Sequence, residues 1–202
     1  MRTMSRVLEA DLSVLRGYLS HYSELPEQEL LEFAAHVSRQ RYQRGEFFTR
    51  IGDTHDRVGF VVHGLFRVYY IGPEGEYHIR NFCQEGRPLG SYATLLTGQA
   101  AHVNIEALED SWVLQFSFTR LAAWFARSAA WERLGRCIAE QHYISRERRE
   151  YSLLAFDARG RISRFHEDFP GLEPRLTRTD IASYIGVRPE TLSRLLGKKR
   201  RT

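Results

Sequence analysis

Between Tyr42 and Phe116, glycines recur every few residues and divide the chain into short runs rich in Val, Ile, Phe and Tyr. Glycine adopts the positive φ angles that tight turns need, whereas β-branched and aromatic residues favour extended strands. This spacing is typical of many short strands joined by tight turns, as in a β-barrel or β-roll. We therefore expect a β-roll in this part of the chain.

The clearest hairpin lies within GFVVHGLFRVYYIGPEGEYHIRNF. Alternation of side chains in FRVYYI and EYHIRNF flanks a turn built on Gly72, Pro73 and Gly75. Glycine and proline at these positions favour a tight connection between two antiparallel strands. The pattern predicts a pair of neighbouring strands on either side of this turn.

Helices are expected before and after the β-roll. SELPEQELLEFAAHV predicts a helix capped near Ser23 or Glu24, with Pro26 in its first turn. Its buried side is expected to hold Leu30, Leu31, Phe33, Ala34 and Val37. From Thr119 to about Leu154 helix formers dominate, which predicts a short helix and then a long one.

The long helix changes character along its length. Trp131, Leu134 and Ile138 give its first half an apolar stripe. Its second half is too polar for a strong coiled coil, although Ile144, Tyr151 and Leu154 could continue a seam between two copies. Asp157 is then expected to cap a further helix that ends before Pro170, and FPGLEP forms a joint before the final segment.

Length and composition exclude several classes of protein. With 202 residues and 43% hydrophobic residues, the chain suits one large domain or two modest ones with a real core. No apolar run approaches the roughly 18 residues of a membrane span, and no secretory signal is apparent, so we expect a cytoplasmic protein without a membrane partner. Cys83 and Cys137 form no CxxC pair, so we expect buried thiols, with neither a zinc site nor a disulfide.

Positive charge concentrates at the end of the chain. From Pro170 onward, eight Lys and Arg residues accompany three Asp and Glu residues, a net charge of +5, whereas the whole chain carries +4. A nearly neutral body with a basic end is typical of a protein that presents one small region to a polyanion. A solvated charged surface is the alternative explanation.

The final segment DIASYIGVRPETLSRLL has the pattern of a helix-turn-helix. Its apolar residues lie where two helices would bury one side against each other; they are Ile181, Ile185, Val187, Leu192 and Leu195. Small Ala182 allows a close crossing, Gly186 permits the positive φ of the turn, and Pro189 suits the first turn of the second helix. A purely structural helical hairpin would have a similar pattern.

Glu190, Ser193 and Arg194 share one side of the expected second helix because they lie three and four residues apart. Arginine can form a paired hydrogen bond with guanine, glutamate can accept from the cytosine amino group, and serine can bond a base or a phosphate. A surface ion pair between Glu190 and Arg194 is the alternative. The basic residues around this side are expected to contact phosphates.

These residues resemble a known family, the bacterial Crp/Fnr regulators. RGEFFTRIGD, VHGLFRVYY and ALEDSWVLQF are similar to its effector-binding β-roll, the long helix to its dimerisation helix, and ETLSR to its recognition helix. The resemblance implies an α+β fold: a cyclic nucleotide-binding-like β-roll (double-stranded β-helix) over residues 1–128, a dimerisation helix over 129–156 and a small helix-turn-helix domain over 157–202. It also implies a homodimer that regulates transcription on an inverted repeat and is not an enzyme, with RNA polymerase as a possible further partner.

The resemblance implies which residues contact double-stranded DNA. Glu190, Ser193 and Arg194 are similar to the branch that recognises TTGA-type half-sites, and Pro189 stands where the cyclic AMP branch has a further guanine-binding arginine. The chain ends just past the recognition helix, as in a shorter branch without the β-wing, so backbone anchoring falls on the KKRR end. The full expected DNA-binding set is Arg188, Glu190, Thr191, Ser193, Arg194, Lys198, Lys199 and Arg200.

The segment PLGSYATLLTGQAAHVNIEAL occupies the position of the family's phosphate-binding cassette. Cyclic nucleotide binders there use a glutamate and an arginine-serine pair, where this chain has Ser91, Ala101 and His102. A buried cyclic phosphate needs a compensating cation, which Ala101 does not supply, so we expect no response to cyclic AMP. The expected effector-pocket residues are Arg80, Gly90, Ser91, Ala101, His102 and Arg146.

Other sensors are not favoured. Two cysteines are too few for the four ligands of an iron-sulfur cluster, and haem-binding relatives have a histidine where Ser91 stands. We therefore expect no cofactor, and either an unknown small-molecule effector or control by abundance. The rivals are a cupin-type metal or enzyme barrel, which the absence of an HxH pair disfavours, and a β-roll signalling module whose final helices dock a protein. An exposed polar side argues against the docking module, since docking helices prefer apolar anchors.

Overall fold

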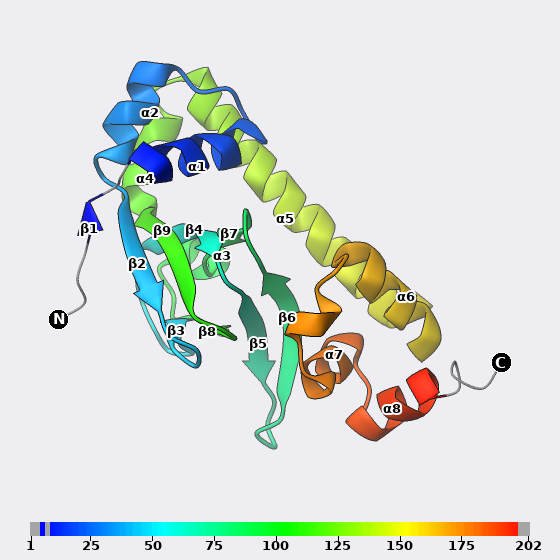
Figure 1. Ribbon diagram of the computed structural model, residues 1–202. Coiled ribbons are helices and arrows are strands. Elements are labelled where there is room, and N and C mark those ends of the chain that lie inside the picture. The colour runs from blue at the N-terminus through cyan, green and yellow to red at the C-terminus, as the bar shows by residue number, and fades with distance from the viewer. Residues whose placement is uncertain (1–4, 7–8, 198–202) are drawn as a thin grey trace. The chain divides into compact units, whose positions relative to one another are not determined.

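The computed structural model describes residues 5–6 and 9–197 of the 202-residue chain (Figure 1). The strands are β1 (Ser5–Arg6), β2 (Ser38–Tyr42), β3 (Phe47–Thr49), β4 (Arg57–His63), β5 (Phe66–Ile71), β6 (Tyr77–Cys83), β7 (Pro88–Leu89), β8 (Asn104–Ala107) and β9 (Ser111–Ser117). The helices are α1 (Glu9–Ser20), α2 (Glu27–Ala34), α3 (Tyr92–Thr97), α4 (Phe118–Phe125), α5 (Ala129–Ala155), α6 (Ala158–Asp168), the 3-10 turn η1 (Glu173–Arg175), α7 (Arg178–Ile185) and α8 (Pro189–Gly197).

The chain divides into two compact units. The first contains residues 1–68 and 82–141, and the second contains residues 69–81 and 142–202. The end of the β5–β6 hairpin therefore belongs to the second unit, together with the second half of α5 and the helices that follow it.

Two sheets form the β-roll. The five-stranded sheet has the order β1-β2-β9-β4-β7, and the four-stranded sheet has the order β3-β8-β5-β6. β9 pairs antiparallel with both β2 and β4. The ring of Tyr42, from the first sheet, has its centroid 5.8 Å from that of Phe48 and 5.7 Å from that of Phe66, both in the second sheet. The two sheets thus share a core, and the expected α+β fold with a β-roll is confirmed.

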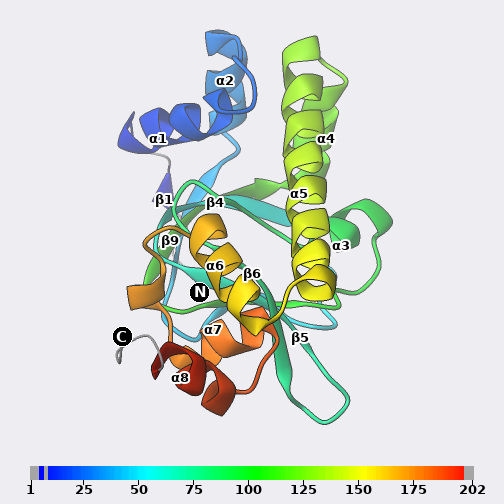
Figure 2. The ribbon, with the colours of Figure 1, turned by 90° about the vertical axis from the view of Figure 1, so that its right-hand side faces the viewer.

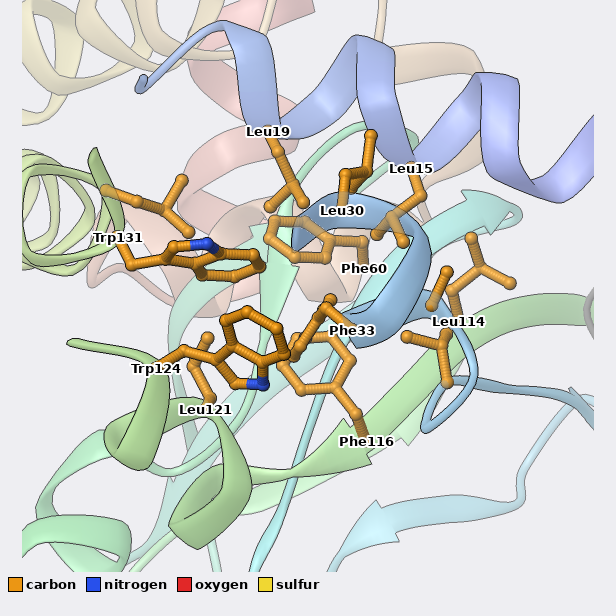
Figure 3. Close-up of a cluster of buried hydrophobic side chains, with 13 residues drawn as sticks. Leu15, Leu19, Leu30, Phe33, Phe60, Leu114, Phe116, Leu121, Trp124 and Trp131 are labelled. Atoms are coloured by element: carbon orange, nitrogen blue, oxygen red, sulfur yellow. The ribbon is translucent and has the colours of Figure 1, made fainter. Parts of the chain in front are cut away.

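A separate cluster of buried side chains lies where the first helices pack on the roll (Figure 3). Trp131, at the start of α5, is fully buried, with its ring centroid 4.8 Å from that of Phe33 in α2 and 4.9 Å from that of Trp124 in α4. Leu134 is also fully buried and Ile138 packs partly against the cluster. The expected apolar stripe of the first half of α5 therefore holds three helices together.

Two expectations for α2 are wrong, one about burial and one about where the helix begins. Leu31 is 47% exposed, whereas Leu30, Phe33, Ala34 and Val37 are buried as expected. Successive residues of a helix point about 100° apart, so a stripe of residues three and four apart leaves the residue after Leu30 on the outer side. The helix also begins at Glu27, one residue after Pro26, which caps it rather than standing in its first turn. α1 and α3 were not expected from the sequence.

The long helix α5 is continuous over 27 residues (Figure 2). Its second half exposes large apolar side chains, namely Tyr143, Ile144, Tyr151, Leu153 and Leu154. Asp157 caps the next helix as expected, because its carboxylate accepts a hydrogen bond of 2.8 Å from Gly160 N. α6 then ends at Asp168, before Pro170. None of the described helices is long and apolar enough to cross a lipid bilayer.

Candidate nucleic-acid interface and effector region

Helix α7 begins at a well-defined cap. The Thr177 hydroxyl accepts a hydrogen bond of 3.1 Å from Asp180 N, and Thr177 N donates one of 3.2 Å to the Asp180 carboxylate. This reciprocal pair is a capping box, which satisfies two backbone donors that a helix start would otherwise leave without partners. Asp180 is 2% exposed, whereas Thr177 is exposed, so only the carboxylate half of the box is buried.

The turn after α7 is built on Gly186, which has φ of 69°. Val187 N donates to Ala182 O over 3.0 Å, and Gly186 N donates to Ser183 O over 3.3 Å. This is the paired bonding of a Schellman motif, in which glycine takes the left-handed conformation at low cost. The expected positive φ at Gly186 is confirmed, and the motif fixes how α7 continues into α8.

Helix α8 buries one side and exposes the other. Leu192 is fully buried, whereas Glu190, Ser193 and Arg194 are exposed. We call these three residues the α8 polar face. Within the described part of the chain no ion pair joins Glu190 to Arg194. The polar face therefore presents a carboxylate, a hydroxyl and a guanidinium to solvent.

The remaining expected DNA-binding residues flank this face or lie beyond the described region. Arg188 is exposed just before α8, and Thr191 is half-buried in its first turn. Lys198, Lys199 and Arg200 lie outside the described residues. The structure thus brings five of the eight expected residues onto or beside one short helix.

Tyr184 attaches α7 to the two preceding helices. Arg149 of α5 donates a hydrogen bond to Tyr184 O and stacks 4.0 Å from the centroid of its ring. The same ring contacts Phe165 and Phe169, with centroids 5.7 and 5.3 Å away. Burial raises the pKa of Tyr184 to about 12, although the Arg149 charge opposes the shift. Tyr184 is therefore a neutral, packed part of the second unit's core.

Ser183, the residue before it, contacts the β5–β6 hairpin. Its hydroxyl donates a hydrogen bond of 2.8 Å to Tyr77 O and accepts one of 2.9 Å from Ile79 N. Both Tyr77 and Ile79 lie in β6. Sequence reasoning missed this contact, because nothing in the pattern around a lone serine indicates a strand more than 100 residues away.

The cassette segment of the first unit has few polar groups available to a ligand. Ser91 is buried and its hydroxyl lies 2.9 Å from that of Thr94, in the first turn of α3. Ala101 is 1% exposed and contributes no polar side-chain atom. Gly90 is half-buried, and His102 is exposed. The position where the resemblance places a phosphate-binding arginine is thus occupied by a buried methyl group.

Two further effector-pocket candidates belong to the second unit. Arg80 Nη2 lies 3.2 Å from Nε2 of His142, and Arg146 is exposed one helical turn further along α5. Burial, together with the smaller effect of the Arg80 and Arg146 charges, lowers the pKa of His142 to about 4. His142 is therefore neutral at pH 7 and accepts the hydrogen bond from Arg80. Among the described residues no group of His, Cys, Asp and Glu could hold a metal ion.

Comparison with known proteins agrees with this architecture. Residues 39–128 match the family model of the cyclic nucleotide-binding domain. A search of curated protein sequences found no match.

Solved structures of similar fold cover most of the chain. FixK2 from Bradyrhizobium japonicum superposes with a TM-score of 0.71 at 20% identity, covering 80% of this chain and 83% of its own. The regulator CLP from Xanthomonas campestris gives 0.70 at 19% identity, covering 87% and 92%. A CRP-family transcriptional regulator from Thermus thermophilus gives 0.63 at 22%, covering 80% and 84%. Residues 39–128 thus match the cyclic nucleotide-binding domain, and the chain has the fold of the Crp/Fnr-type structures.

Proposed function

We propose that this protein is a sequence-specific DNA-binding transcription regulator that acts as a homodimer on a TTGA-like inverted repeat. The observation that carries the proposal is the α8 polar face, which stands exposed on a helix fixed by the Schellman turn at Gly186. The solved structures of similar fold include proteins described as regulators, which agrees with this role. A regulator of this kind works in the cytoplasm, and it needs no catalytic residues.

The chemistry of the α8 polar face suits base edges in the major groove. Arg194 would bond guanine in a paired manner, Glu190 would accept from cytosine, and Ser193 would bond a base or a phosphate. Arg188, exposed beside this face, would contact the DNA backbone, as would the basic residues after Gly197. Backbone contacts set affinity and position, whereas base contacts set sequence preference.

The exposed apolar side chains of α5 support a homodimer. Ile144 and Tyr151 are seven residues apart and Leu154 follows three later, which is the spacing of a coiled-coil seam. Their exposed fractions are 44%, 55% and 80%. Such a stripe on a helix is stabilised when a second copy covers it. In a dimer, two recognition helices about 34 Å apart would match one turn of DNA.

The effector of this protein, if it has one, is not cyclic AMP in our proposal. The buried Ala101 offers no cation to a cyclic phosphate, and the Ser91 hydroxyl is already bonded to Thr94. CLP is described as responsive to c-di-GMP, so regulators of this fold need not share one ligand. An unknown small molecule or control by abundance remains part of the proposal, as does contact with RNA polymerase.

Selection of random duplex DNA with the purified protein, at near-physiological salt and without ligand, tests the proposed function. We expect recovery of an inverted repeat with TTGA-like half-sites. A preference for single half-sites would contradict the dimer. No enrichment, either alone or with cyclic nucleotides and c-di-GMP added, would contradict DNA recognition and favour helices that dock a protein partner.

A further inference from the structure

The hydroxyl of Ser183 occupies the place of a neighbouring strand at the open edge of β6. β6 is the last strand of the four-stranded sheet, so among the described residues no strand lies beside one of its edges. On that edge the Ile79 N–H donates to Ser183 Oγ, and Ser183 Oγ donates to the Tyr77 carbonyl. Edge groups otherwise bond water or another chain. A single side chain thus satisfies one donor and one acceptor of the strand.

Two consecutive residues of α7, Ser183 and Tyr184, join this helix to different elements of the second unit. Ser183 bonds β6, and Tyr184 is bonded by Arg149 of α5 and packed against Phe165 of α6. Successive helical residues point about 100° apart, so the two attachments act on different sides of α7. Together they restrict both translation and rotation of this helix.

We propose that Ser183 is a positioning residue for DNA recognition: it holds α7, and through the Gly186 turn also α8, on the β5–β6 hairpin, and DNA affinity depends on this contact. The inference rests on the proposed function. The contact leaves the α8 polar face exposed, so it is compatible with bound DNA. A recognition helix held in place before binding loses less conformational freedom when DNA is bound.

The hairpin is also the segment through which a change in the roll would reach α7. β5 begins in the first unit at Phe66, and β6 ends in the first unit at Cys83. The part of the hairpin between them, residues 69–81, belongs to the second unit. A shift of β5 moves its neighbour β6, and the two Ser183 hydrogen bonds pass that shift to α7.

The test compares three variants of the full chain by two measurements. Ser183→Ala removes the hydroxyl, Ser183→Thr keeps it, and Ser163→Ala is the matched control, because Ser163 is exposed on α6 and bonds only Arg159 O of its own helix. Amide exchange at Ile79 is measured by nuclear magnetic resonance. DNA affinity is measured on the duplex that the wild-type protein selects.

We expect Ser183→Ala to accelerate amide exchange at Ile79 about fivefold to tenfold and to weaken DNA binding by a similar factor, as befits loss of one ordinary hydrogen bond or two. Ser183→Thr should restore both values, and Ser163→Ala should change neither. The threonine rescue separates the hydroxyl's role from general damage to α7.

Three results would overturn the proposal: unchanged exchange at Ile79, unchanged DNA affinity despite faster exchange, or tighter DNA binding, which would make the contact inhibitory. A wild-type protein that selects no duplex would instead overturn the proposed function. Exchange at Ile79 would still establish in that case whether Ser183 joins α7 to β6, so the two failures are distinguishable.

Discussion

The α8 polar face and the cassette around α3 are the two places where the family resemblance implies ligand binding, but their polar groups differ in exposure to solvent. Glu190, Ser193 and Arg194 are exposed on a helix whose other side is buried. In the cassette, Ser91 is bonded to Thr94 and Ala101 is buried. The difference teaches that the polar groups of α8 face solvent, whereas the cassette position that the resemblance assigns to a phosphate-binding arginine is part of the core.

The largest expected effect concerns the dimer, because our proposal needs two copies of the α8 polar face, one for each half-site. Leu154→Asp places a charge in the seam of α5, where the leucine is 80% exposed and its loss does not disturb the folded monomer. Each buried leucine contributes about 1.5–3 kcal/mol, and a symmetric dimer has two. We expect the dimer dissociation constant to rise at least a hundredfold, measured by sedimentation.

The control for this variant is Leu31→Asp, the same substitution at an exposed leucine of α2. It should leave the dimer and the binding of an inverted repeat intact. A Leu154→Asp protein that remains dimeric would show that the seam lies elsewhere, and the exposed stripe of α5 would need another explanation.

The next largest effect concerns sequence preference. Arg194→Ala should reduce the preference for the selected duplex over a scrambled one by about tenfold to a hundredfold, because a paired contact to guanine contributes about 1–3 kcal/mol of discrimination. Arg188→Ala, a variant of an exposed arginine just before α8, should weaken both duplexes equally and reduce the salt slope by about one.

Fluorescence anisotropy titrations at several salt concentrations measure both quantities. Equal losses on both duplexes for Arg194→Ala would assign it to the phosphate backbone. Lys198→Ala is measured in the same way, and we expect it, like Arg188→Ala, to weaken binding to both duplexes equally.

A smaller effect concerns the pH dependence of stability, which tests whether His142 is neutral beside Arg80 and Arg146. The pKa of His142 is about 4 in the folded protein against 6.5 in the unfolded chain, because of burial and of Arg80 and Arg146. The unfolded state therefore binds a proton first as the pH falls, so stability is lost between pH 6.5 and 4.

His142→Gln removes this contribution. After allowance for solvent screening, we expect it to reduce the acid-induced loss by about 1 kcal/mol, or roughly 2–4 °C in Tm for a chain of this size. Thermal unfolding of both proteins at pH 7.5 and 4.5 measures the difference. Identical acid sensitivity would mean that His142 titrates normally beside the two arginines.

The last prediction is that cyclic AMP has no measurable effect on thermal stability. Cyclic AMP at millimolar concentration should shift Tm by less than about 1 °C, since a ligand stabilises a protein only when its concentration exceeds its dissociation constant. A rise of several degrees would show that the cassette binds a cyclic phosphate without an arginine at position 101, and the contrast between the two regions would fail.

The sequence predicted those features that depend only on residues close together in the chain. Gly186 and Asp157 take their expected places because a positive φ and a helix cap depend on neighbouring residues alone. The hairpin around Gly72 and Gly75 is confirmed for the same reason. The roll followed from glycine spacing, and α2, α4 and α5 followed from periodicity and composition, whereas α1 and α3 were not predicted. The boundaries at 128 and 156 and the DNA-binding set stay predictions.

What could not be predicted depends on partners distant in the chain. Ser183 and Arg149 have ordinary helical surroundings in the sequence, and only folding brings the first to β6 and the second to Tyr184. Leu31 and α1 are different, because periodicity alone indicates both. The three- and four-residue spacing of Leu30, Phe33, Ala34 and Val37 leaves Leu31 on the outer side, and Leu12, Leu15 and Leu19 have helical spacing.

The two hydrogen bonds of Ser183 also impose an order on how the chain matures during synthesis. Ile79 and Ser183 are 104 residues apart, so at a translation rate of about 5–20 residues per second the hairpin leaves the ribosome roughly 5–20 seconds before its partner. During that interval the outer edge of β6 is open and can pair with the strands of other nascent chains. Completion of α7 then satisfies two polar groups of this edge, so a helix made later protects a strand made earlier.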